Sequence, residues 1–285
     1  MTYTTLVDVQ TLASHIDQPS WVLFDCRFSL ADPSRGRRDY LSGHIPGAQY
    51  LDLNQDLSAP VIPGTTGRHP LPTEQEAAHL FGSRGVSAAT QVIAYDDMSG
   101  AIAARLWWML KWLGHDAVAV LDGGWNEWIT SDGATRPGAE HRVPADFRAR
   151  LRPELVVTTD EIRRRRNRSG FRLLDARAPE RYRGETEPID PVAGHVPGAI
   201  SAPFRDNLDS QGRFLPGAEL RQRLKPLLGS SPASEAVAYC GSGVTAAHDI
   251  LAFELAGLGQ PRLYVGSWSE WITDAENPIA VGDEA

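Results

Sequence analysis

The sequence predicts an α/β protein built from two tandem domains, each a mostly parallel sheet with helices on both faces. The chain has 285 residues, which is enough for two ordinary domains. Short apolar runs alternate with longer amphipathic segments, a pattern typical of parallel strands covered by helices. The same motifs occur once in each half, at a spacing much longer than that of solenoid repeats.

Four landmarks appear in the same order in both halves. They are Asp-x-Arg at 25–27 and 175–177, Gly-His-x-Pro-Gly-Ala at 43–48 and 194–199, Ala-Tyr at 94–95 and 238–239, and Trp-x-Glu-Trp-Ile at 125–129 and 268–272. We therefore predict a first domain over 1–135, a linker over 136–155 and a second domain over 156–285. The linker is placed there because the stretch 131–155 is rich in Pro, Gly, Arg and Glu and has the weakest pattern.

Individual elements follow from apolar runs. Residues 21–24, 92–95 and 118–121 are short, apolar and predicted to be buried strands, and 101–113 is predicted to be a helix. In the second half, a short apolar run ends at Tyr239. A Gly-rich turn follows it, and we expect a helix that starts at Ala246 with Thr245 as its cap.

The composition limits the classes of function. The formal net charge is −8, which argues against a general nucleic-acid binder because phosphate contacts need a surplus of Lys and Arg. The basic run 163–166, with Arg168, follows Thr159, Asp160 and Glu161, so we interpret it as the solvated side of a short helix.

The chain shows no sign of secretion or of a membrane span. Its start has no basic stretch followed by an apolar one, and no apolar run reaches the about 18 residues that a spanning helix needs. Only two cysteines occur, Cys26 and Cys240, which makes a disulfide scaffold implausible and favours a reducing compartment. The expected location is the cytoplasm, without membrane partners.

Cys240 is the strongest candidate for chemistry, because it ends a predicted strand and precedes a Gly-rich turn and a helix. The turn consists of Gly241, Ser242, Gly243, Val244 and Thr245. Backbone N–H groups of such a turn have no intrahelical acceptor and converge on an anion, and the helix dipole adds positive potential. We expect a thiolate there that is nucleophilic at neutral pH. The alternative is a small buried hydrophobic residue at a strand end.

The first copy of the repeat lacks this nucleophile. Alignment of Tyr95 with Tyr239 places Asp96 opposite Cys240. We therefore expect one active and one silent domain, with the N-terminal half contributing a wall of the active-site cleft.

Together, these landmarks resemble the tandem-rhodanese sulfurtransferases, the family of thiosulfate sulfurtransferase and 3-mercaptopyruvate sulfurtransferase. The resemblance covers essentially the whole chain. It implies two rhodanese-like domains, a non-catalytic N-terminal one and a catalytic C-terminal one that carries a persulfide on the loop cysteine, Cys240. It also implies small anionic sulfur donors and thiophilic acceptors: cyanide, thiols and thioredoxin-like reductants.

The chemistry also fits the residues. A thiolate at Cys240 attacks the outer sulfur of a donor and expels sulfite or the enolate of pyruvate, and the persulfide then passes its outer sulfur to an acceptor. Backbone N–H groups from Gly241 to Thr245 would stabilise the charge in both half-reactions. This scheme needs neither a metal nor an organic cofactor.

For donor binding, the resemblance points to Arg181, whose planar guanidinium suits a carboxylate or a thiosulfonate. A surface ion pair is the alternative for this residue. Arg177 is interpreted as structural, because Arg27 occupies the same place in the silent domain. The same reasoning makes His44 and His195 fold elements that bond to local backbone.

The features that bear on donor identity disagree. The loop Cys-Gly-Ser-Gly-Val-Thr resembles the mercaptopyruvate branch, whereas thiosulfate enzymes usually carry cationic side chains directly after the cysteine. The mercaptopyruvate branch also carries a second arginine nine residues after the first, and here that position is Asp190. We favour 3-mercaptopyruvate slightly, because Ser242 can donate to a keto or enolate oxygen and an uncharged loop offers a dianion little.

The N-terminal half also resembles the mercaptopyruvate enzymes in the segments that supply an aspartate and a histidine to the cleft. These positions map to Asn54 and His69, so the aspartate is absent and a proton relay is weakened. His69 is expected to bind substrate, with an exposed loop histidine as the alternative.

Two other functions stay open, and the residues argue strongly against a third. One is a mainly thiosulfate:cyanide sulfurtransferase, and another is a persulfide carrier that serves a protein partner, because its first half-reaction is identical. The third is a cysteine phosphatase, which also holds a thiolate at a helix start. That function needs an arginine just after the loop, where this chain has Ala246 and Ala247.

Overall fold

The computed structural model describes residues 2–283, which divide into two compact units. Unit 1 comprises residues 2–59, Leu71–Arg152 and Ser210–Arg213, and unit 2 comprises Pro60–Pro70, Pro153–Asp209 and residues 214–283. Two short segments therefore belong to the unit formed mainly by the other half of the chain. Residues 139–152 form neither helix nor strand. The linker over 136–155 and the domain bounds beside it stay predictions.

Unit 1 contains a five-stranded parallel sheet in the order β1-β5-β4-β2-β3. Its strands are β1 (Leu6–Val7), β2 (Trp21–Asp25), β3 (Ala48–Tyr50), β4 (Gln91–Tyr95) and β5 (Val118–Leu121). Its helices are α1 (Val9–His15), α2 (Arg35–Ser42), α3 (Glu74–Ser83), α4 (Ala103–Trp112) and α5 (Gly124–Thr130). β2, β4 and β5 are buried along their whole length, as expected for parallel strands covered on both faces.

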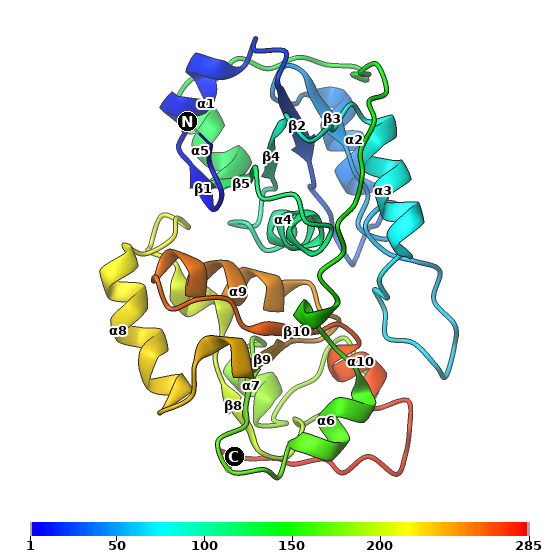
Figure 1. Ribbon diagram of the computed structural model, residues 1–285, viewed down its shortest axis with the longest axis vertical. Helices are drawn as coiled ribbons and strands as arrows, with labels where there is room; N and C mark the ends of the chain where they lie inside the picture. The colour runs from blue at the N-terminus through cyan, green and yellow to red at the C-terminus, as the bar shows by residue number, and fades with distance from the viewer. Residues whose placement is uncertain (1, 284–285) are drawn as a thin grey trace. The chain divides into compact units, whose positions relative to one another are not determined.

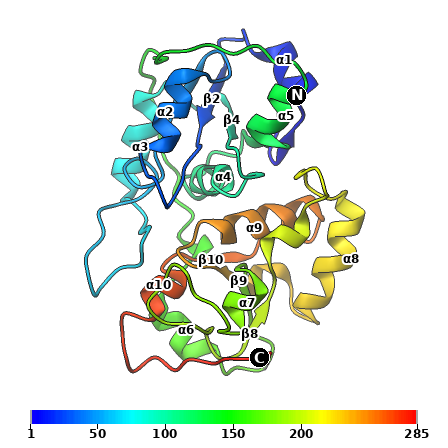
Figure 2. The same ribbon diagram turned by 180° about the vertical axis from the view of Figure 1, so that it is seen from behind.

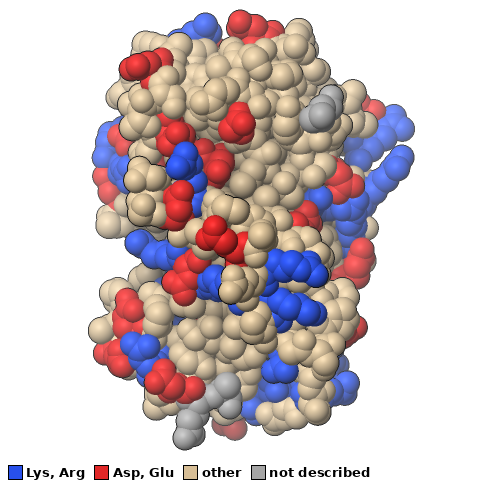
Figure 3. Space-filling view, turned by 90° about the vertical axis from the view of Figure 1, so that its left-hand side faces the viewer, with Lys and Arg blue, Asp and Glu red and all other residues tan. Residues whose placement is uncertain are grey.

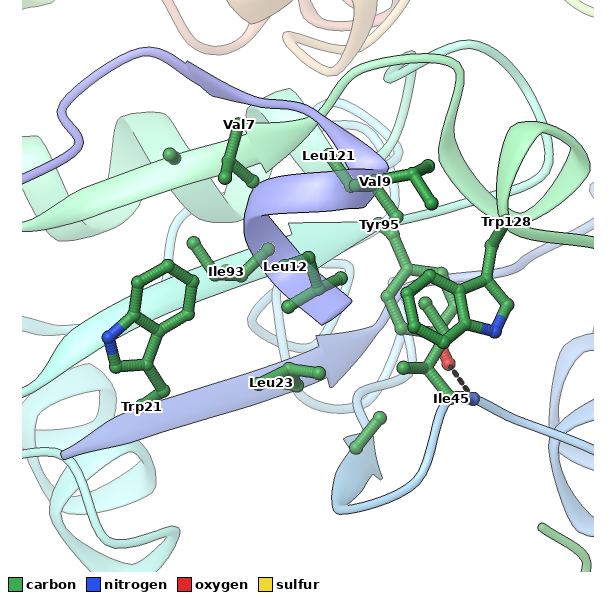
Figure 4. Close-up of a cluster of buried hydrophobic side chains, with 12 residues drawn as sticks. Val7, Val9, Leu12, Trp21, Leu23, Ile45, Ile93, Tyr95, Leu121 and Trp128 are labelled. Atoms are coloured by element: carbon green, nitrogen blue, oxygen red, sulfur yellow. Dashed lines mark hydrogen bonds between the residues drawn. The ribbon is translucent and has the colours of Figure 1, made fainter. Parts of the chain in front are cut away.

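Side chains from alternate strand positions form the core on one face of this sheet (Figure 4). Leu23 and Ile93 meet Leu12 of α1 and Trp128 of α5 there, and the Tyr95 hydroxyl accepts a hydrogen bond of 3.2 Å from the Ile45 N–H. The opposite positions of the strands face α3 and α4.

Unit 2 repeats the arrangement with the order β6-β10-β9-β7-β8, again all parallel. Its strands are β6 (Val156–Val157), β7 (Arg172–Asp175), β8 (Ala199–Ser201), β9 (Ala236–Tyr239) and β10 (Arg262–Tyr264). Its helices are α6 (Thr159–Arg165), α7 (Pro179–Tyr182), α8 (Gly217–Leu228), α9 (Thr245–Leu255) and α10 (Ser267–Trp271), with short 3-10 turns at Pro153–Leu155, Phe204–Asn207 and Ala233–Glu235. In this unit α8 and α9 lie on one side of the sheet, and α6 and α10 on the other (Figures 1 and 2). The predicted fold is thus confirmed.

The Asp-x-Arg motifs are structural in both units. Arg27 pairs with Asp25 at 2.6 Å and Arg177 with Asp175 at 2.7 Å, and all four side chains are almost fully buried. Each arginine also donates to the carbonyl of the glycine that opens the Gly-His-x-Pro-Gly-Ala motif, at 2.7 Å and 2.6 Å. Burial works against the charge of Arg177, but the adjoining Asp175 carboxylate raises the pKa of Arg177 above its ordinary value, so the arginine is held charged.

The two motif histidines bond to local backbone, as predicted. Nδ1 of His44 lies 2.9 Å from the carbonyl of Tyr40, and Nδ1 of His195 lies 2.7 Å from that of Tyr182. Each imidazole also stacks on the same tyrosine, with ring centroids 4.2 Å and 3.8 Å apart. These residues fix the turn before β3 and β8.

The basic run of the second half lies on α6 and after it. Arg163 pairs with Asp160 and Asp274, and Arg165 pairs with Glu161 and Glu235. This confirms the predicted helix with a charged, solvated side. Figure 3 shows acidic and basic side chains intermixed among other residues on the face that it displays.

Candidate active site

Cys240 lies directly after the carboxyl end of β9, at the edge of the parallel sheet where such folds usually bind ligands. It is a free cysteine and only 2% exposed. The loop that follows leads into α9, which begins at Thr245 with Val244 as its N-cap. The prediction that Thr245 caps the helix was therefore wrong: Thr245 already has helical geometry, and no side chain caps this end.

The loop is tied to the start of α10. The Cys240 N–H donates to Oγ of Ser267 at 3.1 Å. In return, the carbonyl oxygens of Cys240 and Gly241 accept hydrogen bonds from the N–H groups of Trp268 and Ser269, at 3.0 Å and 2.9 Å. Because these bonds use the backbone on both sides of Cys240, the cysteine is held at a fixed place relative to β10 and α10.

Two residues of the site have a backbone in the left-handed region. Gly243 has φ +73°, and a methyl group there would lie 2.5 Å from the carbonyl oxygen of Val265, so only glycine fits. Ser267 has φ +55° and is fully buried. A non-glycine residue in this conformation costs on the order of 1 kcal/mol, and such strain concentrates at functional sites. Ser267 was not predicted from the sequence, because its counterpart in unit 1 is Gly124.

The equivalent loop of unit 1 binds an anion of its own. Oδ1 of Asp96 accepts the N–H groups of Met98 and Gly100, at 2.8 Å and 2.9 Å, and Oδ2 accepts those of Ile102 and Ala103, at 2.7 Å and 2.8 Å. The backbone carbonyl of Asp96 also accepts a hydrogen bond of 2.8 Å from the N–H of Trp125, as the carbonyl of Cys240 does from Trp268 in unit 2. The loop design shared by the two units thus directs backbone N–H groups at an anion.

Cys26 has no such setting. It is fully buried at the end of β2, and burial, together with the nearby Asp25 carboxylate, raises the pKa of the Cys26 thiol well above its ordinary value. The corresponding residue in unit 2 is Ala176, so the fold needs only a small apolar side chain there.

Arg181 lies in α7, after β7, with its side chain 14% exposed. A methyl group at Gly241 would lie 3.6 Å and 3.7 Å from the two Nη atoms of Arg181, so the guanidinium faces the residue after the cysteine. It also pairs with Glu187 at 2.7 Å and with Asp190 at 3.1 Å, both of which are nearly buried. The arginine is therefore close to the loop and is not an isolated surface ion pair.

The segment Pro60–Pro70 brings two further side chains into unit 2. Nδ1 of His69 forms a hydrogen bond of 2.7 Å with Oγ of Ser242, and His69 is 4% exposed, so the alternative of an exposed loop histidine was wrong. Arg68 forms an ion pair with Asp190 and lies against Gly241. Asn54 belongs to unit 1, where its N–H donates to Asp52 at 2.8 Å in a turn after β3.

Unit 2 therefore brings together the predicted cysteine loop, Arg181 and His69. Arg68 was not predicted from the sequence, and Asp190 was expected only as the replacement of an arginine. The one available signal was that Arg68 directly precedes His69. The description of the loop as uncharged holds for its own side chains, but two guanidinium groups lie beside it.

Among residues 2–283, no group of three or more His, Cys, Asp or Glu side chains is placed to hold a metal ion. Within the same part of the chain, the helices are too short or too polar to cross a membrane.

Comparison with known proteins agrees with this geometry. A rhodanese-like domain model matches residues 8–131 and 158–274. The chain is 50% identical to a probable 3-mercaptopyruvate sulfurtransferase of Pseudomonas aeruginosa, with 99% of this chain and all of that protein covered. It is 37% identical to a putative thiosulfate sulfurtransferase of Mycobacterium tuberculosis, over 91% of this chain and 90% of that one.

A solved structure shows the same architecture. The 3-mercaptopyruvate sulfotransferase of Escherichia coli superimposes with a TM-score of 0.81 and 32% identity, over 94% of this chain and all of that one. Two matched domains and relatives of this similarity over almost the full length settle the family. The chain belongs to the rhodanese family and is a sulfurtransferase with two rhodanese domains.

Proposed function

We propose that this enzyme transfers a sulfane sulfur from 3-mercaptopyruvate or thiosulfate to a thiophilic acceptor such as cyanide or a thiol, through a persulfide on Cys240. The observation that carries the proposal is the position of Cys240, directly before the loop that leads into α9, with the guanidinium of Arg181 facing the next residue, Gly241. Asp96 supports it, because the matching loop of unit 1 already holds an anion with four backbone N–H groups.

In the first half-reaction, the Cys240 thiolate attacks the outer sulfur of the donor. A new S–S bond forms at the cysteine as the donor's bond to that sulfur breaks, and the electron pair of the broken bond leaves with the donor. With thiosulfate the leaving group is sulfite, and with 3-mercaptopyruvate it is the enolate of pyruvate, which then takes up a proton. No net oxidation or reduction by an outside reagent is needed.

In the second half-reaction, the acceptor attacks the outer sulfur of the persulfide. The S–S bond breaks, and its electron pair returns to Cys240 as the thiolate. Cyanide becomes thiocyanate, and a thiolate becomes a persulfide. Loop N–H groups from Gly241 to Thr245 stabilise the negative charge of the sulfur at both stages, without moving.

Arg181 binds the anionic end of the donor in this proposal, because its guanidinium faces Gly241, the residue after the nucleophile. Ser242 donates its hydroxyl proton to the keto oxygen of 3-mercaptopyruvate, where negative charge develops as the enolate leaves. The hydrogen bond of 2.7 Å between Ser242 and His69 orients this hydroxyl and offers a route for the proton.

The slight preference for 3-mercaptopyruvate rests on two supports. The Ser242–His69 pair gives a keto acid a partner that thiosulfate does not need. The relative at 50% identity is named after 3-mercaptopyruvate, whereas a relative at 37% is named after thiosulfate. A cytoplasmic location belongs to the same proposal, because both cysteines are unpaired and such a nucleophile needs a reducing compartment.

The test is incubation with each donor, followed by mass spectrometry of the intact protein and of its peptides. We expect one added sulfur on Cys240, removable by reductant, with release of pyruvate or sulfite. The Cys240→Ala variant should neither gain sulfur nor turn over, and the Cys26→Ala control should do both. If the sulfur on Cys240 reaches a small acceptor only when a partner protein is added, the protein is a persulfide carrier and not an enzyme in its own right. Turnover in Cys240→Ala would overturn the proposal.

A further inference from the structure

Two guanidinium groups approach the same small residue of the catalytic loop. A methyl group at Gly241 would lie 2.8 Å from Nη2 of Arg68, closer than to either Nη atom of Arg181. Arg68 thus fills the space that a side chain directly after Cys240 would occupy. A positive charge stands beside the loop although the loop has none in its sequence.

Several contacts hold Arg68 in this place. Its backbone N–H donates to Oγ of Ser269 at 3.1 Å. The preceding Gly67 lies so close to the carbonyl of Gly266 that a methyl group there would be 2.6 Å from the oxygen. The segment is therefore fitted closely against the start of α10, next to the residues that anchor the cysteine loop.

Asp190 connects the two arginines. One of its oxygens pairs with Nη1 of Arg68 and the other lies 3.1 Å from Nη2 of Arg181, and its side chain is 3% exposed. Nε of Arg68 is buried and has no hydrogen-bond partner among the described residues, so Asp190 does not saturate this guanidinium. Burial lowers the pKa of Arg68, and negative charge at Cys240 works in the opposite direction, which places both groups in one electrostatic cluster.

We propose that Arg68 is the second donor-binding cation of this site, that it favours dianionic donors, and that Asp190 is an internal carboxylate with which the donor's anionic group competes. The inference rests on the proposed persulfide chemistry and names the residues that set the donor class. With Arg68 beside it, the loop is suited to a dianion although its own side chains are uncharged.

Charge explains the expected selectivity. Thiosulfate carries two negative charges and 3-mercaptopyruvate one carboxylate, so loss of one nearby positive charge affects thiosulfate about twice as strongly in free energy. If a charge-assisted contact contributes about tenfold for the monoanion, the same change gives about a hundredfold for the dianion. Asp190 lowers both affinities, because it neutralises part of the cluster before the donor arrives.

The experiment compares kcat/KM for thiosulfate and 3-mercaptopyruvate, with cyanide as acceptor, at constant ionic strength. Arg68→Ala should lower the value about a hundredfold with thiosulfate and about tenfold with 3-mercaptopyruvate, and Arg68→Lys should lie between it and the wild type. Asp190→Asn should lower KM for thiosulfate. The double variant Arg68→Ala/Asp190→Arg moves the charge to another element and should recover part of the lost thiosulfate activity.

Gly241→Ala provides a test that keeps the charge, because the methyl group pushes the Arg68 guanidinium aside. It should shift donor preference in the same direction as Arg68→Ala, without adding to it in the double variant. Arg183→Ala is the matched control, since this arginine follows α7, pairs with Glu185 and makes no contact with the loop among the hydrogen bonds and ion pairs of the described residues.

The outcomes separate the two proposals. If neither donor loads Cys240 of the wild type, the proposed function fails. If both donors load it, but Arg68→Ala, Arg68→Lys and Gly241→Ala leave the thiosulfate to 3-mercaptopyruvate ratio unchanged, the role of Arg68 is refuted and the function stands. A raised KM for thiosulfate in Asp190→Asn refutes the competing-carboxylate role.

Discussion

Exchange of Asp96 for asparagine should destabilise unit 1 although it changes only one non-hydrogen atom. The asparagine oxygen can still accept two of the four backbone N–H groups, but its NH2 group faces the other two donors. Each buried donor left without an acceptor costs about 1–3 kcal/mol, so we expect a loss of about 2–6 kcal/mol. Asp96 is fully buried, so water cannot take over these bonds.

The assay is urea unfolding followed by tryptophan fluorescence, combined with hydrogen exchange at Met98, Gly100, Ile102 and Ala103. Exchange at Ile102 and Ala103, or at the other pair if the amide is flipped, should accelerate. Asp132→Asn is the control, because Asp132 is exposed and its positive φ of 56° suits asparagine equally well. A change in unfolding free energy below about 0.5 kcal/mol, with unaltered exchange, would refute the argument that the loop requires a full anion.

Three further outcomes are expected. Gly243→Ala should abolish sulfur transfer and lower the free energy of unfolding by more than the about 1 kcal/mol that a positive φ alone costs. Gly138 has φ +91° and open space around it, so Gly138→Ala should show only that smaller loss in thermal unfolding. Burial raises the pKa of Asp249 to about 8, although the hydrogen bond from Asn207 works in the opposite direction. Because the unfolded chain loses this proton near pH 4, the stability that the protonated form contributes is complete below pH about 4. Above that pH it declines by up to about 1.4 kcal/mol per pH unit, until pH about 8. Asp249→Asn should remove that decline in unfolding free energies measured from pH 4 to 9, and an unchanged slope would contradict it. Cys26→Ala should keep both the Tm, within about 2 °C, and kcat/KM, because a pocket that holds Ala in unit 2 loses little when the thiol is removed.

The longer elements could be predicted from the sequence because their signals are local. The apolar run 118–121 coincides with β5, and 92–95 differs from β4 by one residue. The helix predicted over 101–113 is observed at Ala103–Trp112. The two-residue strands β1 and β6 could not be found this way, because two residues carry no periodic pattern and only pairing in the sheet defines them.

In the candidate site, too, only the residues with a local sequence signal could be predicted. The cysteine, its glycines and the helix that follows are consecutive, so their anion-binding geometry could be predicted from the sequence. Arg68 could not, because it lies on a segment distant in sequence and meets the loop only through tertiary packing. From its spacing to Arg181, Asp190 is expected to replace an arginine, whereas in the fold it serves as the counter-ion of Arg68, which comes from a distant segment.

The carboxylate in the loop of unit 1 has a consequence for how the two halves respond to solutes. The Asp96 carboxylate always occupies the N–H groups of that loop, so an added oxyanion cannot bind there and stabilise unit 1 in this way. The cysteine loop has no carboxylate of its own, and occupancy by an oxyanion adds binding free energy to the folded state alone. At millimolar concentrations, where the general stabilising effect of such salts is small, sulfate or sulfite should therefore protect unit 2 from heat more than unit 1, which makes the catalytic half a calorimetric sensor of its own ligands.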